Sequence, residues 1–131
     1  MYLLDTDICV YIIKKKPEQV LKKLVQQDIA HVAISSITLS ELEYGAEKSP
    51  YREQEKRALA EFLAPLTVLP YAEDAAACYG EARAWLEKQG TSIGPMDLLI
   101  TAHALSVKAT LVTNNVREFK RVPGLKVENW L

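Results

Sequence analysis

The stretch "MYLLDTDICVYII" (residues 1–13) places two aspartates inside an otherwise apolar run. Residues 2–5 predict a short buried strand, and a helix follows it almost at once. Asp5 ends this strand, where a carboxylate is costly to bury unless a cation or hydrogen-bond donors meet it. Asp7 has a simpler explanation, because an aspartate at the start of a helix can cap its first turn. We expect Asp7 or Thr6 to cap the helix and Asp5 to hold a cation.

Short apolar strands and amphipathic helices alternate along the rest of the chain. Strands are predicted at residues 2–5, 31–36, 67–70, 110–113 and 125–130, and helices at 8–15, 17–28, 38–49, 51–66, 72–90 and 94–108. Strands separated by helices favour a parallel sheet that is covered on both faces. The sequence therefore predicts an α/β fold with a short parallel sheet of four to five strands flanked by helices. Its 131 residues fit one domain, 1–131.

The composition is that of an ordinary globular protein, with 49% hydrophobic and 25% charged residues and a net charge of −1. This balance gives no support of its own to nucleic-acid binding. The two cysteines, Cys9 and Cys78, lie in apolar helical patterns and are expected to be reduced core residues, as in a cytoplasmic protein. We find neither a signal-peptide pattern nor a segment of membrane-spanning length, and we expect no membrane association.

Three acidic residues occupy matching places in the predicted sheet. Asp5 ends the first strand, Glu41 lies in the helix after the second, and Asp97 opens the helix predicted to begin at residue 94. Strand ends and helix starts can meet at one edge of a parallel sheet, so we expect the three to converge. Carboxylates brought together repel one another and need a cation, and oxygen ligands suit Mg²⁺ or Mn²⁺.

Each of these acids also has a purely structural explanation to weigh. Glu41 completes a Thr38-x-x-Glu41 capping box, and taken alone we would read it as a cap. Asp97 in a first helical turn could simply complement the helix dipole. Asp5 has no obvious partner of this kind, and the matching positions of all three favour a metal site. The histidines, His31 and His103, have no partners at zinc-binding intervals and are expected to be structural or exposed.

Four segments in this order resemble one family, the PIN-domain ribonucleases of the VapC toxin type. The segments are "LLDTDICVYIIKKKPE" (3–18), "ISSITLSELEYGAEKS" (34–49), "GTSIGPMDLLITAHAL" (90–105) and "TLVTNNVREFKRVPGLKVENWL" (110–131). The resemblance spans essentially the whole chain. It implies a PIN-like three-layer fold and Mg²⁺-dependent endoribonuclease activity, with Mn²⁺ as a substitute. It also implies that the catalytic acids are Asp5, Glu41 and Asp97.

The chemistry of phosphodiester hydrolysis assigns roles to these residues. Asp5 and Asp97 are expected to bind the metal, and Glu41 to act through a metal-bound water or to orient the attacking water. The polar groups expected beside the metal ligands or on the substrate side are Thr6, Thr113 and Asn115.

The resemblance is incomplete at one acidic position. Where the family often carries a fourth acid, this chain has Asn115, which leaves the number of bound metals open. Glu118, one helical turn further on, could turn inward and compensate, but we expect it to be a solvated surface residue. Arg117, close to Asn115, is our candidate for a contact with an RNA phosphate.

The resemblance further implies partners and a substrate. The partners are a VapB-type antitoxin and a second copy of the chain, in a homodimer and a toxin–antitoxin hetero-oligomer. The substrate is a structured RNA, in particular a tRNA anticodon stem-loop, whose cleavage inhibits translation.

Two other functions remain open at this point. Haloacid-dehalogenase-like phosphatases also begin with a strand that ends in Asp-x-Asp, with Asp5 as nucleophile and Asp7 as general acid. Against this, residues 8–9 continue an apolar helix, and we find no later lysine and paired-aspartate motif. The second alternative is a PIN-like module that binds RNA or a protein without cutting, which would leave the three acids without a role.

Overall fold

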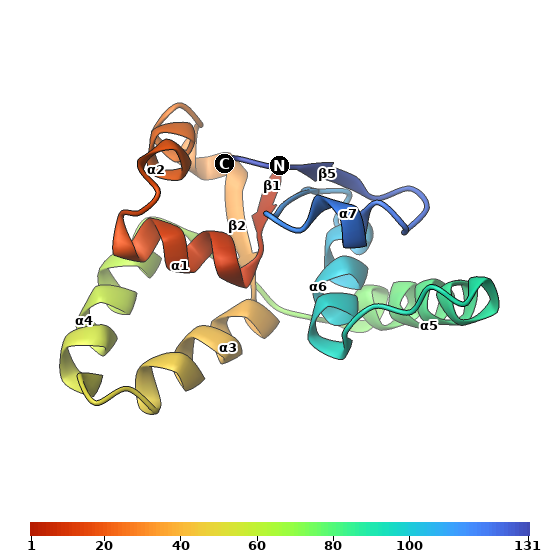
Figure 1. Cartoon of the computed structure of the whole chain (residues 1–131), viewed down its shortest axis with the longest axis horizontal. Coiled ribbons are helices and arrows are strands. Elements are labelled where there is room, and N and C mark those ends of the chain that lie inside the picture. The colour runs from red at the N-terminus through yellow and green to blue at the C-terminus, as the bar shows by residue number, and fades with distance from the viewer.

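The computed structural model describes residues 1–131 and has a five-stranded sheet at its centre (Figure 1). The strands are β1 (Tyr2–Leu4), β2 (Val32–Ser35), β3 (Thr67–Leu69), β4 (Thr110–Val112) and β5 (Lys126–Glu128). Every neighbouring pair is parallel, and the order across the sheet is β3-β2-β1-β4-β5. The predicted α/β class and the upper strand number are confirmed, with β1 as the central strand.

Helices make every connection between the strands. They are α1 (Thr6–Lys14), α2 (Glu18–Val25), the short 3-10 helix η1 (Ile29–His31), α3 (Ser36–Glu47), α4 (Arg52–Leu63), α5 (Glu73–Gln89), α6 (Pro95–Ser106) and α7 (Val116–Phe119). In Figure 1, α1 to α4 lie on one side of the strands, and α5, α6 and α7 lie on the other. All six predicted helices are present, with their ends shifted by a few residues.

Successive strand residues face opposite helical layers. Leu4 and Ile34 pack into a core formed with α1, α2, α3 and α4. Leu3 and Leu111 point the other way and pack against α6 and α7. This is the two-residue period of a strand, and burial on both faces explains why the strands read as continuous apolar runs. The sheet is therefore the middle layer of three, as the resemblance implied.

Both cysteines are free thiols. Cys9 is a fully buried core residue of α1, as predicted, whereas Cys78 in α5 is only partly buried. None of the helices has the length and apolar content needed to cross a membrane.

The residues after β5 complete the hydrophobic core between the sheet and helices α1 to α4. Trp130 is 1% exposed, and its ring meets that of Tyr2 edge-on with 5.4 Å between the centroids. Its indole Nε1–H donates to Glu128 Oε1 at 2.9 Å, so the polar part of the ring is satisfied. Trp130, which follows the edge strand β5, thereby packs against the central strand β1.

We predict that Trp130→Ala lowers the free energy of unfolding by about 3–5 kcal/mol, because a fully buried indole leaves a cavity that the surroundings fill only in part. Urea denaturation followed by circular dichroism measures this. The control is Leu131→Ala, whose side chain belongs to a residue that is 49% exposed; it should change the free energy by less than about 0.5 kcal/mol. Equal losses in the two variants would contradict the core role of Trp130.

Candidate active site

Asp5 lies between the end of β1 and the start of α1. Its backbone N–H donates to the carbonyl of Val112 at 3.0 Å, which joins the carboxyl ends of β1 and β4. Its Oδ1 accepts the N–H of Ile8 at 3.0 Å, so Asp5 itself is the N-cap of α1. The expectation that Asp7 or Thr6 caps this helix is wrong, because the helix begins immediately after the strand and leaves only Asp5 between them. Asp7 is exposed in the first turn.

Glu41 lies in the second turn of α3. The hydroxyl of Ser35 accepts the N–H of Ile37 at 3.0 Å and caps this helix. The capping-box interpretation of Thr38 and Glu41 is therefore wrong, because α3 begins three residues earlier than the box requires. The carboxylate of Glu41 instead accepts a hydrogen bond from the hydroxyl of Thr6 at the start of α1. Glu41 thus points towards the edge of the sheet where Asp5 lies.

Asp97 lies in the first turn of α6, three residues after the N-cap Gly94. Glu118 of α7 reaches this same turn. Its Oε1 accepts the N–H of Gly94 at 3.3 Å, and its Oε2 accepts a hydrogen bond from the side-chain amide of Asn115. The expectation that Glu118 is a solvated surface residue is wrong, because α7 packs its carboxylate against the start of α6. No pattern in the sequence around Glu118 indicates that contact.

The four acidic side chains lie close enough to influence one another's ionisation. Burial, together with the negative charges of Glu118, Asp5 and Glu41, raises the pKa of Asp97 to about 7. Burial also raises the pKa of Asp5 to about 6, although a hydrogen bond from Thr113 acts in the opposite direction. No lysine, arginine or histidine nitrogen lies within 4.0 Å of any of these carboxylates. We call the four residues Asp5, Glu41, Asp97 and Glu118 the acidic centre.

A divalent cation fits the acidic centre by the chemistry of its donors. Carboxylate oxygens that carry unbalanced negative charge suit Mg²⁺ or Mn²⁺. No three His, Cys, Asp or Glu side chains surround one point closely enough to hold a metal by themselves. This open arrangement agrees with Mg²⁺, which usually takes one or two carboxylates and keeps several waters. Asp5 and Asp97 are the two acids whose pKa values are most clearly raised, and they can supply those carboxylates.

The other predicted site residues lie around the acidic centre. Thr113 is fully buried, hydrogen-bonds to Asp5, and accepts the backbone N–H of Asn115 at 3.0 Å. Asn115 in turn holds Glu118 through its side-chain amide. Arg117 is exposed on α7 and forms no ion pair, so its guanidinium is available to a ligand.

A buried histidine connects two of the helices that carry the acids. The Nδ1 atom of His103 in α6 lies 2.7 Å from the hydroxyl of Ser35, which also caps α3. Burial lowers the pKa of His103, so the ring is neutral at physiological pH and Nδ1 can accept the serine proton. This contact fixes α6, with Asp97, against the start of α3, with Glu41. His103 is structural and His31 is exposed, as predicted.

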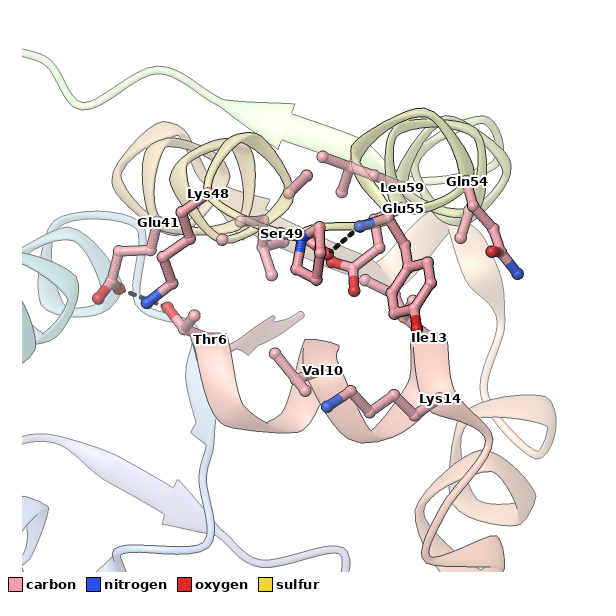
Figure 2. A pocket seen from close by; sticks show the side chains of 16 residues that line it. Thr6, Val10, Ile13, Lys14, Glu41, Lys48, Ser49, Gln54, Glu55 and Leu59 are labelled. Atoms are coloured by element: carbon pink, nitrogen blue, oxygen red, sulfur yellow. Dashed lines mark hydrogen bonds between the residues drawn. The ribbon is translucent and has the colours of Figure 1, made fainter.

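A groove of about 670 Å³ opens between α1, α3 and α4 and ends at the acidic centre (Figure 2). Thr6 and Glu41 form its inner end, where the dashed line in Figure 2 marks their hydrogen bond. Apolar side chains such as Val10, Leu42 and Leu59 line much of its length. Sequence analysis did not find this groove, because each helix contributes only a few residues and their packing angles decide that a hollow remains.

Comparison with known proteins agrees with this geometry. Residues 2–125 match the sequence model of the PIN domain. Ribonuclease VapC2 of Rickettsia felis is 47% identical over 133 aligned positions, which cover 99% of this chain and 98% of the relative. The tRNA(fMet)-specific endonuclease VapC of Salmonella typhimurium is 43% identical, over 98% of this chain and 97% of the relative. A chain in the crystal structure of DNA-bound VapBC from Salmonella typhimurium superposes with a TM-score of 0.94 at 43% identity, covering 99% of this chain and 98% of that chain.

A parallel sheet in this order, with carboxylates gathered at its carboxyl edge, defines a PIN-domain protein. The sequence relatives narrow the class further. The chain belongs to the VapC ribonucleases of the PIN-domain family. Because the chain belongs to this family, the alternative of a haloacid-dehalogenase-like phosphatase, with Asp5 as nucleophile, is set aside.

The raised pKa values predict how stability changes with pH when metal is absent. A carboxyl group with a raised pKa stays protonated in the folded state at pH values where the unfolded chain has lost that proton. The free energy of unfolding should therefore fall as the pH rises from about 4, the ordinary aspartate pKa, to about 7, the pKa of Asp97. Denaturant titrations in EDTA at several pH values measure this fall.

The variant Asp97→Asn removes one of the two groups responsible, so its stability should fall less steeply over the same pH range. Excess MgCl₂ should restore stability to the unmodified protein at pH 7 and do less for the variant. If both proteins show the same pH dependence in EDTA, Asp97 does not carry the unbalanced charge.

Proposed function

We propose that this protein is the toxin of a VapBC-type toxin–antitoxin pair and acts as a metal-dependent endoribonuclease. The observation that carries the proposal is the acidic centre, in which four carboxylates from four different elements converge without a basic partner. Such a centre suits a reaction that needs divalent cations, and phosphodiester hydrolysis is one. Membership of the VapC ribonucleases supports this chemistry over a module that binds RNA without cutting it.

In this proposal Asp5 and Asp97 hold Mg²⁺, for which Mn²⁺ is a substitute. When bound, the cation would lower the pKa of a water molecule and neutralise charge on the phosphate. Glu41, fixed by the hydroxyl of Thr6, orients the attacking water. Thr113 keeps the Asp5 carboxylate in place. No side chain needs to become covalently attached to the substrate.

At position 115, where the family often carries a fourth acid, Asn115 acts together with Glu118. The amide of Asn115 is neutral, but it donates to Glu118 and holds that carboxylate beside Asp97. The negative charge missing at position 115 is thereby supplied from one turn further along the chain. A second cation, if one binds, would lie on the Asp97 and Glu118 side of the acidic centre.

We propose tRNA(fMet) as the substrate, with cleavage in its anticodon stem-loop and inhibition of translation as the result. The support is the activity named for the relative from Salmonella typhimurium, a tRNA(fMet)-specific endonuclease. Arg117, exposed on the helix that carries Glu118, is the proposed contact for an RNA phosphate. The free cysteines agree with a cytoplasmic protein, where such a substrate is available.

Asp97→Asn should abolish cleavage while the protein stays folded. Removing one carboxylate weakens metal binding and also relieves repulsion, so the melting temperature should stay equal or rise. We expect the rate of tRNA(fMet) cleavage to fall by roughly 100-fold or more, even at high Mg²⁺, since a metal ligand supports several kcal/mol of transition-state stabilisation. Gel analysis of the RNA and calorimetric titration with Mg²⁺ measure the two effects.

Asp7→Asn is the matched control, because it removes the same charge two residues from Asp5 at an exposed position outside the acidic centre. It should retain cleavage within a few-fold. If Asp97→Asn cuts as fast as Asp7→Asn, the metal-site assignment fails. If the unmodified protein cuts no RNA with Mg²⁺ or Mn²⁺, the non-cleaving alternative is correct.

We further propose that a VapB-type antitoxin segment covers the groove between α1, α3 and α4. Solved relatives are VapBC complexes, and the groove offers an apolar surface that ends at the acidic centre. A segment lying there would cover Glu41 and Thr6 directly. Homodimers of the toxin and hetero-oligomers with the antitoxin are the assemblies we expect.

Gly45 allows a direct test of the groove. It lies in the last turn of α3, lines the groove, and has no atom within 4 Å of the place where a side chain would begin. Gly45→Leu should therefore stabilise the helix by up to about 1 kcal/mol through helix propensity. Because the new side chain fills the groove, we expect at least roughly tenfold weaker binding of the co-expressed antitoxin, as overpacking costs 1–3 kcal/mol.

The matched control is Gly80→Leu in α5, a helical glycine with equally open surroundings that lies outside the groove. It should gain similar helix stability and keep the antitoxin affinity. Surface plasmon resonance with the purified antitoxin compares the two variants. Equal affinities would place the antitoxin elsewhere on the protein.

A further inference from the structure

Two lysines line the groove beyond the acidic centre. Lys14 is the last residue of α1, and Lys48 directly follows α3. Both are exposed, and neither ammonium lies within 4.0 Å of a carboxylate. The Nζ atom of Lys48 lies over the ring of Tyr44, 4.9 Å from its centroid, a contact that uses no hydrogen bond. Two cationic groups therefore remain available to a ligand in the groove.

Helix geometry places these lysines at a defined distance from the acidic centre. Lys14 follows Thr6 by eight residues along α1, about 12 Å at the rise of an α-helix. Lys48 follows Glu41 by seven residues along α3, about 10 Å by the same measure. Figure 2 shows both side chains directed towards the Thr6–Glu41 end of the groove. The backbone of each lysine thus lies further out along the groove than Thr6 and Glu41, and the ammonium groups reach back towards that end.

The other residues that line the groove add little negative charge. Beyond Glu41, the α1 and α3 walls carry no carboxylate, and the one acid left in the lining is Glu55 of α4. A nucleic acid whose scissile phosphate lies at the acidic centre would have its neighbouring phosphates repelled by the same carboxylates. Cations a short distance away reduce this repulsion and hold the backbone, because phosphate contacts dominate nucleic-acid affinity.

We propose that the groove between α1, α3 and α4 is the path of the RNA strand on one side of the scissile phosphate, with Lys14 and Lys48 binding its backbone phosphates. The inference rests on the proposed ribonuclease function and adds a substrate path to it. In this proposal the apolar residues Val10 and Leu42 face the sugars and bases of the RNA. They offer no hydrogen bonds, so this part of the groove does not select a base sequence. An antitoxin segment in the same groove would then inhibit by competing with the RNA for its path.

The test compares Lys14→Ala/Lys48→Ala with the unmodified protein in cleavage of purified tRNA(fMet) with Mg²⁺ at several KCl concentrations. We expect KM to rise roughly tenfold, the effect of losing two partly solvated ion pairs. The kcat should stay within about twofold, because these contacts are made equally in the ground and transition states. The slope of log(kcat/KM) against log[KCl] should become shallower by about 1.4, or about 0.7 for each lysine removed.

Two further variants separate charge from other effects. Lys88→Ala/Lys126→Ala removes two exposed lysines outside the groove, and it should match the unmodified protein in KM and in salt slope. Lys14→Arg/Lys48→Arg keeps both charges and should restore KM. Recovery in the arginine variant together with the shallower slope of the alanine variant supports the proposal.

A binding measurement keeps the inference separate from the cleavage assignment. Fluorescence anisotropy of labelled tRNA(fMet) with Asp97→Asn, with and without the two alanine substitutions, reports affinity when nothing is cut. Equal affinities and equal salt slopes would overturn the RNA path even if the parent protein is an active ribonuclease. So would weaker binding of the co-expressed antitoxin with an unchanged KM for RNA, which would assign the lysines to the protein partner. Failure of the parent protein to cut would instead contradict the proposed function alone.

Discussion

Four carboxylates meet at the carboxyl edge of the sheet, and no lysine, arginine or histidine nitrogen lies within 4.0 Å of them. The hydrogen bonds around them hold this concentration of negative charge in place. Each acid comes from a different connection: Asp5 from the end of β1, and the others from α3, α6 and α7. Burial and mutual repulsion both oppose their ionisation, as the raised pKa values of Asp5 and Asp97 indicate. The ionised carboxylates repel one another when no cation is present, and a bound cation would stabilise them. Metal-assisted hydrolysis requires such a centre. The fold tolerates the repulsion because the hydrophobic cores and the parallel sheet stabilise the chain elsewhere.

Hydrogen bonds to neutral groups hold this centre in place. Asp5 accepts from the first turn of its own helix, Glu41 from Thr6, and Glu118 from Gly94. None of these donors carries a positive charge, so they orient the carboxylates without neutralising them. The oxygens that remain free keep the charge that a cation needs. The neutral donors thus fix where the carboxylates lie, and the absence of a nearby cationic side chain leaves their negative charge unbalanced.

Local sequence patterns predicted the elements well and their junctions less well. The apolar strands and amphipathic helices are where the periodicity placed them, since a buried layer requires that pattern. The cap of the first helix was assigned to Asp7 or Thr6 and is formed by Asp5 instead, because one residue decides where the strand ends and the helix starts. The Thr38–Glu41 capping box failed for the same reason, since Ser35 lies earlier and caps α3. Several residues in that segment can cap a helix, and only the packing of β2 selects one of them.

The convergence of Asp5, Glu41 and Asp97 was accessible from sequence because parallel strands bring their carboxyl ends to one edge. The inward position of Glu118 was not, since it depends on contact between α7 and the turn before α6. The groove was equally hidden, because three helices far apart in sequence define it. Contacts between distant segments set both features, and no periodicity within one segment encodes them.

The burial of Trp130 against Tyr2 has a consequence for the order in which the chain can fold. Tyr2 lies in the central strand, and its aromatic partner follows it 128 residues later. Until residue 130 has been synthesised, the core around β1 lacks this indole, and until residues 126–128 are made the sheet lacks β5. Contacts between residues so far apart in sequence form late, because the chain between them must first be present and then closed into a loop. The central strand is therefore made before all the others and reaches its full stability after them.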